Sequence, residues 1–211
     1  SVNKEIQEGL VNTYKESGFF PEWASPGHRG CMVGNNSASV LVDAYMKGVK
    51  VDDLKTLYEG LLHGTKNVHP EVSSTGRLGY EYYNKLGYVP CDVKIHENAA
   101  RTLEYAYDDW CISVLADSLG DTETKEKYAR FADAYEFYFD PATRFMRGLD
   151  SKGEWRTPFN PRSSNHRNDD YCEGTAWQWT WFTPHDIEGL VELMGGEQAF
   201  VGKLDSLFTA D

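Results

Sequence analysis

Apolar residues recur with helical spacing through most of the chain. The clearest stretch covers residues 98–119, where apolar side chains follow one another every three to five positions. It ends at Gly120, a residue typical of a helix C-terminus. Asp121 begins a second periodic stretch, which stops before Pro141. Two long antiparallel helices joined by a short turn, an αα-hairpin, are therefore predicted.

The same pattern recurs elsewhere, whereas strands are scarce. Asn36 and Ser37 are expected to cap a helix that ends at Gly48, and Asp52 and Asp53 are expected to start another helix that ends at Gly64. Further helical stretches are predicted over residues 2–11, 187–194 and 200–207. Repeated helical hairpins indicate an all-α fold, either an α-solenoid or a closed α/α toroid.

Long irregular segments separate the hairpins, over residues 18–34, 64–76 and 140–172. Such loops are uncommon in compact domains unless they contribute to function. The last one is polar and rich in turn residues, including His166 and Arg167. We expect it to pack on the fold through its aromatic side chains Trp155 and Phe159.

Composition narrows the possible partners. The 211 residues suit one domain and carry 21 Lys plus Arg against 33 Asp plus Glu, a formal net charge of −12. This balance disfavours nucleic acid and anionic membranes, and no apolar run is long enough to span a bilayer. The four cysteines are too widely spaced for a CxxC motif, and Cys111 is expected in the core. Aromatic residues make up 14%, which suits a protein that stacks on sugar rings as well as one with an aromatic core.

The densest candidate for chemistry is the segment 169–179, DDYCEGTAWQW. Its closely spaced carboxylates repel one another, and the neighbouring tryptophans desolvate whichever is buried, so both effects favour a protonated carboxyl. A protonated carboxyl is what a general acid needs. Glu173 also precedes a short helical run, whose N-terminus favours the charged form. These residues alone leave Glu173 as either an acid–base residue or a helix N-terminal carboxylate.

A second candidate is Asp108 with Asp109 in the middle of the long helix 98–119. Adjacent helical residues point about 100° apart, so we expect one carboxylate in solvent and one with a structural partner. The alternative is a ligand-binding role. The chain has no HExxH, GxSxG, P-loop or dinucleotide motif. The remaining interpretation is catalysis by carboxylates on a ligand that aromatic side chains hold.

Six segments follow one another along the chain: GCMVGN (30–35), VDAYMKG (42–48), RTLEYAYDDW (101–110), EGTAWQ (173–178), PHD (184–186) and LMGG (193–196). With these segments in this order, the sequence resembles glycoside hydrolase family 92, the bacterial exo-acting α-mannosidases. The resemblance implies an (α/α)6 toroid behind an N-terminal β-sandwich, calcium dependence, and hydrolysis with inversion. It makes Glu173 the general acid, although the family more often has Asn where this chain has Thr175. It also makes Asn35, Asp108 and Trp177 candidates for lining the sugar pocket, with packing at the toroid centre as the alternative for the last two.

The resemblance further implies that residues 1–211 are a single-domain piece of that toroid, without the β-sandwich and the final helices. The general base and most calcium ligands are expected beyond Asp211, so this piece alone is expected to be inactive. Helix faces meant for missing neighbours predict self-association. The expected substrate is terminal α-linked mannose, with α-1,2 linkage favoured, on mannans or N-glycans in the periplasm or outside a bacterial cell. A non-catalytic sugar- or partner-binding module and an (α/α)6 glycosidase or lyase of different sugar specificity remain alternatives.

Overall fold

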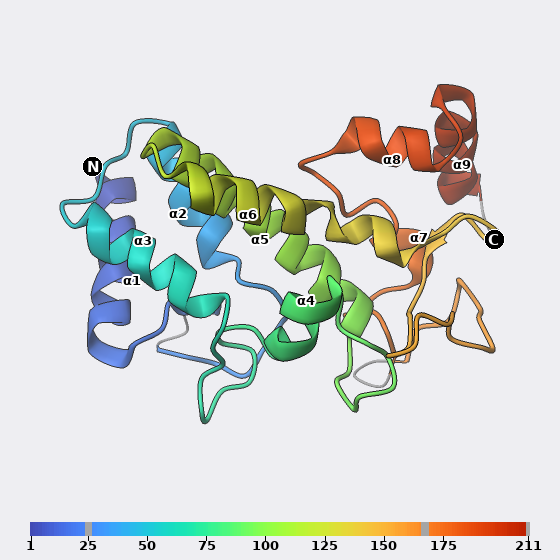
Figure 1. Cartoon of the computed structure of the whole chain (residues 1–211), viewed down its shortest axis with the longest axis horizontal. Coiled ribbons are helices and arrows are strands. Elements are labelled where there is room, and N and C mark those ends of the chain that lie inside the picture. The colour runs from blue at the N-terminus through green and yellow to red at the C-terminus, as the bar shows by residue number, and fades with distance from the viewer. Residues whose placement is uncertain (24–26, 166–168, 210–211) are drawn as a thin grey trace.

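The structure is a computed structural model that describes residues 1–23, 27–165 and 169–209. His166 and Arg167 lie outside the described residues. The described chain is mostly helical, with one small two-stranded sheet (Figure 1). Its elements are α1 (Val2–Ser17), α2 (Ser37–Met46), α3 (Leu54–Gly64), α4 (Tyr80–Leu86), α5 (Asn98–Ser118), α6 (Thr122–Ala132), the 3-10 helix η1 (Asp133–Tyr138), β1 (Phe139–Asp140), β2 (Phe145–Met146), α7 (Ala176–Trp179), α8 (Ile187–Leu193) and α9 (Glu197–Thr209). The predicted all-α fold class is confirmed.

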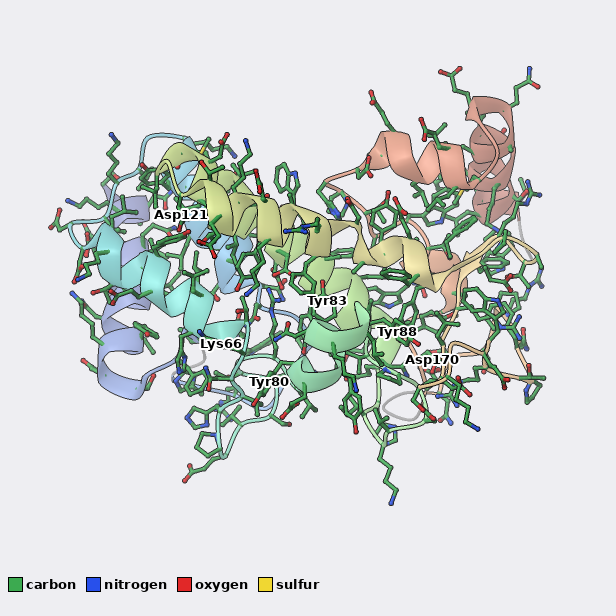
Figure 2. The ribbon with its side chains drawn as sticks, viewed as in Figure 1. Lys66, Tyr80, Tyr83, Tyr88, Asp121 and Asp170 are labelled. Atoms are coloured by element: carbon green, nitrogen blue, oxygen red, sulfur yellow. The ribbon has the colours of Figure 1, made fainter. Side chains whose placement is uncertain are left out.

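The hairpin of α5 and α6 runs through the centre of the molecule. Gly120 takes the left-handed conformation at the turn, with φ of 76°. The Asp121 side chain then caps α6 by accepting from the Thr124 backbone N–H at 3.1 Å. Asp121 lies near one end of this hairpin, and Asp170 lies beyond the other (Figure 2).

The helix predicted to continue to Pro141 changes form after Ala132. It continues as the 3-10 helix η1, in which residues three apart lie on the same face. Tyr135 and Tyr138 are three apart and both fully buried, so this winding turns both rings into the core. The tighter turn therefore explains why the α-helix ends earlier than the pattern indicated.

The predicted helix caps are mostly confirmed, with one correction. Asp53 accepts from the Thr56 N–H at 3.1 Å at the start of α3. Asn36 occupies the N-cap position of α2, but its side chain makes no cap hydrogen bond. The Ser37 N–H instead donates to Glu22 Oε2 at 2.9 Å, because the preceding loop returns this carboxylate to the helix start. The short helix α4 was not predicted, since it lacks a long apolar repeat.

Two main apolar clusters hold the fold together. One surrounds α4, η1 and the strands, and the loop side chains Trp155 and Phe159 pack against it as expected. The other joins α1, α2, α3 and the second half of α5, and it contains Cys111, which is 3% exposed. Among the helices of the described residues, none has the length and apolar character needed to cross a bilayer.

Candidate active site around Glu173

Glu173 lies in the tight turn that leads into α7. Its backbone is left-handed, with φ of 47°, and its side chain is exposed. A Cβ atom at Gly174 would lie 3.0 Å from Gln178 Oε1 and 3.2 Å from Trp179 Nε1, so glycine suits this position. Thr175 is the N-cap of α7, and its N–H donates to Gln178 Oε1 at 2.9 Å in a capping box. The EGTAWQ segment is therefore a closely packed turn that presents the Glu173 carboxyl outward.

The backbone carbonyls just before this turn accept hydrogen bonds from the start of α5. The Glu97 N–H donates to the carbonyl oxygen of Asp169 at 2.8 Å, and the Ala99 N–H donates to that of Asp170 at 2.9 Å. The first N–H groups of a helix have no acceptor within the helix, so these carbonyls satisfy them. The start of α5 thereby fixes the position from which Glu173 extends.

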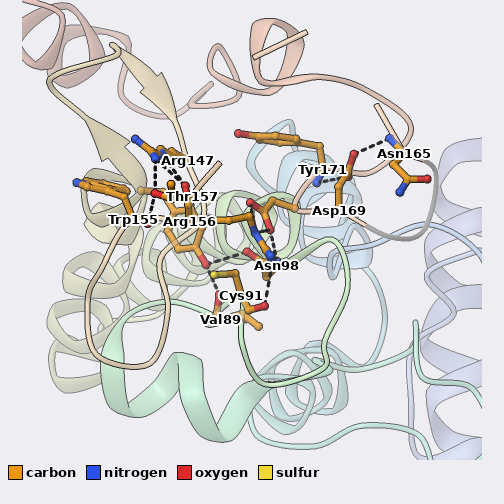
Figure 3. Close-up of polar contacts among 12 residues, drawn as sticks. Val89, Cys91, Asn98, Arg147, Trp155, Arg156, Thr157, Asn165, Asp169 and Tyr171 are labelled. Carbon is orange, nitrogen blue, oxygen red and sulfur yellow. Dashed lines mark hydrogen bonds and ion pairs between the residues drawn. The ribbon is translucent and has the colours of Figure 1, made fainter. Parts of the chain in front are cut away.

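The Asp169 and Asp170 side chains are engaged within the fold, and Figure 3 shows the contacts of Asp169 with Asn165 and Tyr171. Asp170 is 4% exposed and accepts from Asn98 Nδ2 and Arg156 Nε, both at 2.8 Å. Asp169 accepts from the Asn165 N–H at 2.7 Å. Of the three carboxylates in segment 169–179, the buried one is therefore Asp170, with a cation beside it, while Glu173 remains accessible.

Glu173 forms part of the wall of a pocket of about 290 Å³. Three separate segments and the start of α5 converge there. The lining residues are Gly30, Cys31, Met32, Ser73, Ser74, Leu78, Lys94, Ile95, His96, Glu97, Arg101, Cys172 and Glu173. Hydroxyl, cationic and carboxylate groups around a few apolar side chains suit a small ligand with many hydroxyl groups.

Strained backbone concentrates at this pocket. Five non-glycine residues of the described chain have left-handed φ angles, and Arg144 is the one that does not line the pocket. Met32, Lys94, Glu97 and Glu173 do line it, with φ angles of 64°, 59°, 60° and 47°. Each such residue costs of order 1–3 kcal/mol and persists where the surroundings fix it, typically at functional sites. Nothing in the sequence around Met32 or Lys94 indicated a left-handed backbone at these two residues.

Asn35 and Asp108 are in direct contact, but neither lines the Glu173 pocket. The Asn35 N–H donates to Asp108 Oδ2 at 2.7 Å, and both residues are buried. The Asn35 side chain also accepts from Arg77 Nε at 2.6 Å and donates to Glu22 Oε1 at 2.9 Å. Asn35 therefore ties the loop that carries Met32 to α5 and to the segment before α4.

Both members of the Asp108–Asp109 pair are fully buried, which corrects the expectation that one is in solvent. Asp108 contacts Asn35, and Asp109 contacts Arg77 and the α4 residue Tyr83, so other segments cover both carboxyls. Asp109 pairs with Arg77, whose Nη2 lies 2.7 Å from Asp109 Oδ1. Arg77 is itself fully buried, and its guanidinium carbon lies 5.1 Å from the Tyr105 ring centroid. Arg77 was not among the predicted residues, because a lone Arg in a loop gives no sign that it will be buried.

Several buried carboxyl groups lie around the single guanidinium of Arg77, and their pKa values are raised. Burial raises the pKa of Asp108 to about 8, with Arg77 and the Asn35 N–H opposing the shift and Glu22 adding to it. Burial likewise raises the pKa of Glu22 to about 7. Burial and then Asp108 raise the pKa of Glu104. The cluster therefore holds protons at neutral pH that an unfolded chain would release.

We expect Asp108→Asn to change the pH dependence of stability. Between about pH 4 and pH 8 the native Asp108 stays protonated while the unfolded residue ionises, so the free energy of unfolding falls as pH rises. Asn has the same shape and accepts the same Asn35 N–H bond without titrating. The stability of the variant relative to the parent should rise by about 2–4 kcal/mol from pH 5 to pH 8. Urea unfolding at both pH values measures this, and a pH-independent difference would contradict it.

Trp177 lies on α7, apart from the residues that line the Glu173 pocket. Its ring packs edge-on against Phe145, with centroids 4.8 Å apart. The ammonium of Lys203 in α9 lies 4.8 Å from the Trp177 ring centroid and 3.3 Å from that of Phe145. In this structure Trp177 therefore connects α7 to β2 and α9.

The resemblance also implies a calcium site. Within residues 1–23, 27–165 and 169–209, no group of three or more His, Cys, Asp or Glu side chains is placed to hold a metal ion. Calcium takes six to eight oxygen ligands, so these residues do not form such a site by themselves. We therefore derive no step through calcium.

A family model described as the glycosyl hydrolase family 92 catalytic domain matches residues 1–211. The chain belongs to this family. A family GH92 inverting mannosidase of Bacteroides thetaiotaomicron superposes with a TM-score of 0.93 at 47% identity, over 97% of this chain and 27% of that enzyme. A second GH92 α-mannosidase of that organism, solved with mannoimidazole, gives 0.89 at 34% identity, over 100% of this chain and 28% of that one.

A curated relative is also similar, an uncharacterized secreted glycosidase of the fungus Arthroderma benhamiae. It is 28% identical over 94% of this chain and 29% of its own length. The chain thus spans less than a third of each of these relatives. Their agreement confirms the fold and the family of this chain, and the activity of the whole protein is a separate inference.

Proposed function

We propose that the protein carrying this chain is an exo-acting α-mannosidase that inverts anomeric configuration, with Glu173 as general acid. The observation that supports this most directly is the position of Glu173. Its carboxyl lies on the wall of a polar 290 Å³ pocket, on a backbone held in a strained turn. Family membership and two mannosidase neighbours supply the sugar and the reaction class.

In an inverting glycosidase the acid protonates the leaving oxygen while a second carboxylate activates a water on the opposite face of the ring. The exposure of Glu173 at the pocket supports the first task for this residue, whereas Asp169 and Asp170 are bonded into the fold. Asn35 and Asp108 contribute by holding the loop that brings Met32 to the pocket. Trp177 contributes by packing α7, which follows the acid. We assign no base among these residues.

We further propose the fold, cofactor, substrate and location that the family resemblance implies. The chain would form part of an (α/α)6 toroid, and the complete enzyme would depend on calcium whose ligands come largely from elsewhere. The substrate would be terminal mannose, α-1,2-linked, on mannans or N-glycans outside the bacterial cytoplasm. The similarity to a secreted glycosidase supports the location, and a mannoimidazole complex in the family supports the sugar.

Proton NMR tests the stereochemistry directly. We expect the complete natural protein, supplied with calcium and α-1,2-mannobiose, to release β-mannose first, because water attacks the face opposite the leaving group. Early α-mannose would contradict inversion. Release of sugar from α-glucosides or uronates in place of mannosides would assign a different specificity, and binding of mannosides without any release would indicate a non-catalytic module.

A further inference from the structure

Trp110 is a half-exposed tryptophan on the side of α5 away from the Glu173 pocket. Its exposed fraction is 38%. Arg101, which lines that pocket, lies nine positions earlier on the same helix. At about 100° and 1.5 Å per residue, the two side chains leave opposite faces of α5, roughly 14 Å apart along its axis. Whatever contacts Trp110 is therefore separate from a ligand at Glu173.

The indole of Trp110 lies at a second pocket, of about 330 Å³. This pocket, which we call the Trp110 pocket, is formed by α5, the end of α6 and the turn before α8. Its lining residues are Trp110, Ala129, Arg130, Ala132, Asp133, His185 and Asp186. It thus combines one broad aromatic surface with two small side chains and several charged groups.

The indole is held in place by neighbouring rings. The Tyr107 ring lies nearly parallel to it, at 16° and 6.1 Å between centroids, and His185 lies 6.3 Å away. His185 in turn is fixed by a 2.9 Å contact between its Nε2 and the Ala132 carbonyl oxygen. A ring that is already ordered costs little conformational entropy when a ligand stacks on it.

Arg130 and Asp133 supply polar groups beside the indole. The Arg130 Nε donates to the Glu126 carbonyl at 3.2 Å, an exposed contact within its own helix. Asp186 is already engaged, since it accepts from Tyr135 at 2.6 Å and from the Gly189 N–H at 2.9 Å. Asp133, three residues after Arg130, is the other carboxylate that lines the pocket. An aromatic face flanked by a guanidinium and a carboxylate matches a pyranose, which has one apolar face and hydroxyl groups at its edge.

We propose that the Trp110 pocket is a second, non-catalytic binding site for a pyranose unit of a mannose-containing glycan. The choice of sugar rests on the proposed function, whereas the site itself rests on the geometry above. A glycan held there would keep the enzyme on a polymer between cleavage events, without contacting Glu173.

The test compares retention on yeast α-mannan by affinity electrophoresis, using the complete natural protein with Glu173→Gln so that the polymer stays intact. We expect Trp110→Ala to weaken retention about five- to tenfold, the loss that one stacked ring predicts. Asp133→Asn should weaken it less. Phe137→Ala is the matched control, since Phe137 is also exposed, at 54%, but lies outside the pocket. It should leave retention unchanged.

Hydrolysis of α-1,2-mannobiose by the same variants with Glu173 restored separates this proposal from the proposed function. Trp110→Ala should keep kcat/KM within about twofold of the parent, because a disaccharide does not need a second site. Equal mannan retention in Trp110→Ala and the parent would overturn the proposal, as would equal losses in Trp110→Ala and Phe137→Ala. Absence of hydrolysis in the parent would contradict the proposed function and leave the retention result to decide on the site.

Discussion

Replacing Glu173 by Gln should lower hydrolysis of α-1,2-mannobiose about 10²- to 10⁴-fold in the complete natural protein. Gln fills the same space but has no proton to give to the departing sugar oxygen. A mannoside whose leaving group is an acidic dinitrophenol needs no such proton, so its rate should fall far less. Because Glu173 is exposed, the melting temperature should stay within a degree or two of the parent. Initial rates on the two substrates measure the effect.

Glu97→Gln is the matched control, since Glu97 is the other carboxylate of the same pocket. Its side chain accepts from Arg101 Nη2 at 3.3 Å, so the change should alter sugar binding. The rate should therefore fall by the same factor on both substrates, whatever the leaving group. Equal losses on the two substrates in Glu173→Gln would show that Glu173 is not the acid. A leaving-group dependence in Glu97→Gln alone would move that role to Glu97.

The sequence predicted best where a local rule decides the structure. The repeat over residues 98–119 and the turn at Gly120 correspond to α5 and its end, since apolar spacing and a left-handed glycine are local properties. The short run after Glu173 is α7, because Thr175 and Gln178 form a capping box within four residues. Such features depend on few distant contacts, so the pattern alone contains them.

The site was predicted less completely because its residues meet through tertiary contacts. Asn35, Arg77 and Asp108 are far apart in sequence, and no spacing shows that a backbone N–H, a guanidinium and a carboxylate will share one buried volume. The same holds for the pocket wall, where residues 30–32, 73–78 and 94–97 converge on Glu173. The resemblance to a family indicated Glu173 as the candidate acid, whereas the residues that surround it required the structure.

Arg77→Met should lower the free energy of unfolding by about 3–5 kcal/mol. Met replaces the volume of Arg77 but removes the ion pair with Asp109 and the hydrogen bond to Asn35. The fully buried carboxyl of Asp109 would then lose its ion-pair partner, and Asp108, which is protonated at neutral pH, would lose the nearby cation that opposes its raised pKa. Removing one partner of a buried pair costs more than the pair contributes, because the remaining charge stays desolvated.

The loss should extend to the Glu173 pocket. Asn35 depends on Arg77 for one side-chain contact, and the segments next to both residues carry Met32 and Ser74 to the pocket wall. Chemical unfolding measures the stability, and Arg130→Met, an exposed arginine on α6, is the control that should shift it by less than about 0.5 kcal/mol. If Arg77→Met and Arg130→Met unfold alike, Arg77 does not hold this cluster together.

A second change distinguishes lost charge from lost packing. Adding Asp109→Asn to Arg77→Met removes one of the carboxyls left without a cation, while the residue keeps its shape. Since Asp109 contacts Arg77 directly, the two effects should not add, and the double variant should recover about 1–2 kcal/mol relative to Arg77→Met. Additive losses would mean that Arg77 acts through its packing on Tyr83 and Tyr105, at 5.8 and 5.1 Å, rather than through its charge. Recovery would instead show that the cation is what allows α5 to bury adjacent aspartates behind the loop that carries Met32.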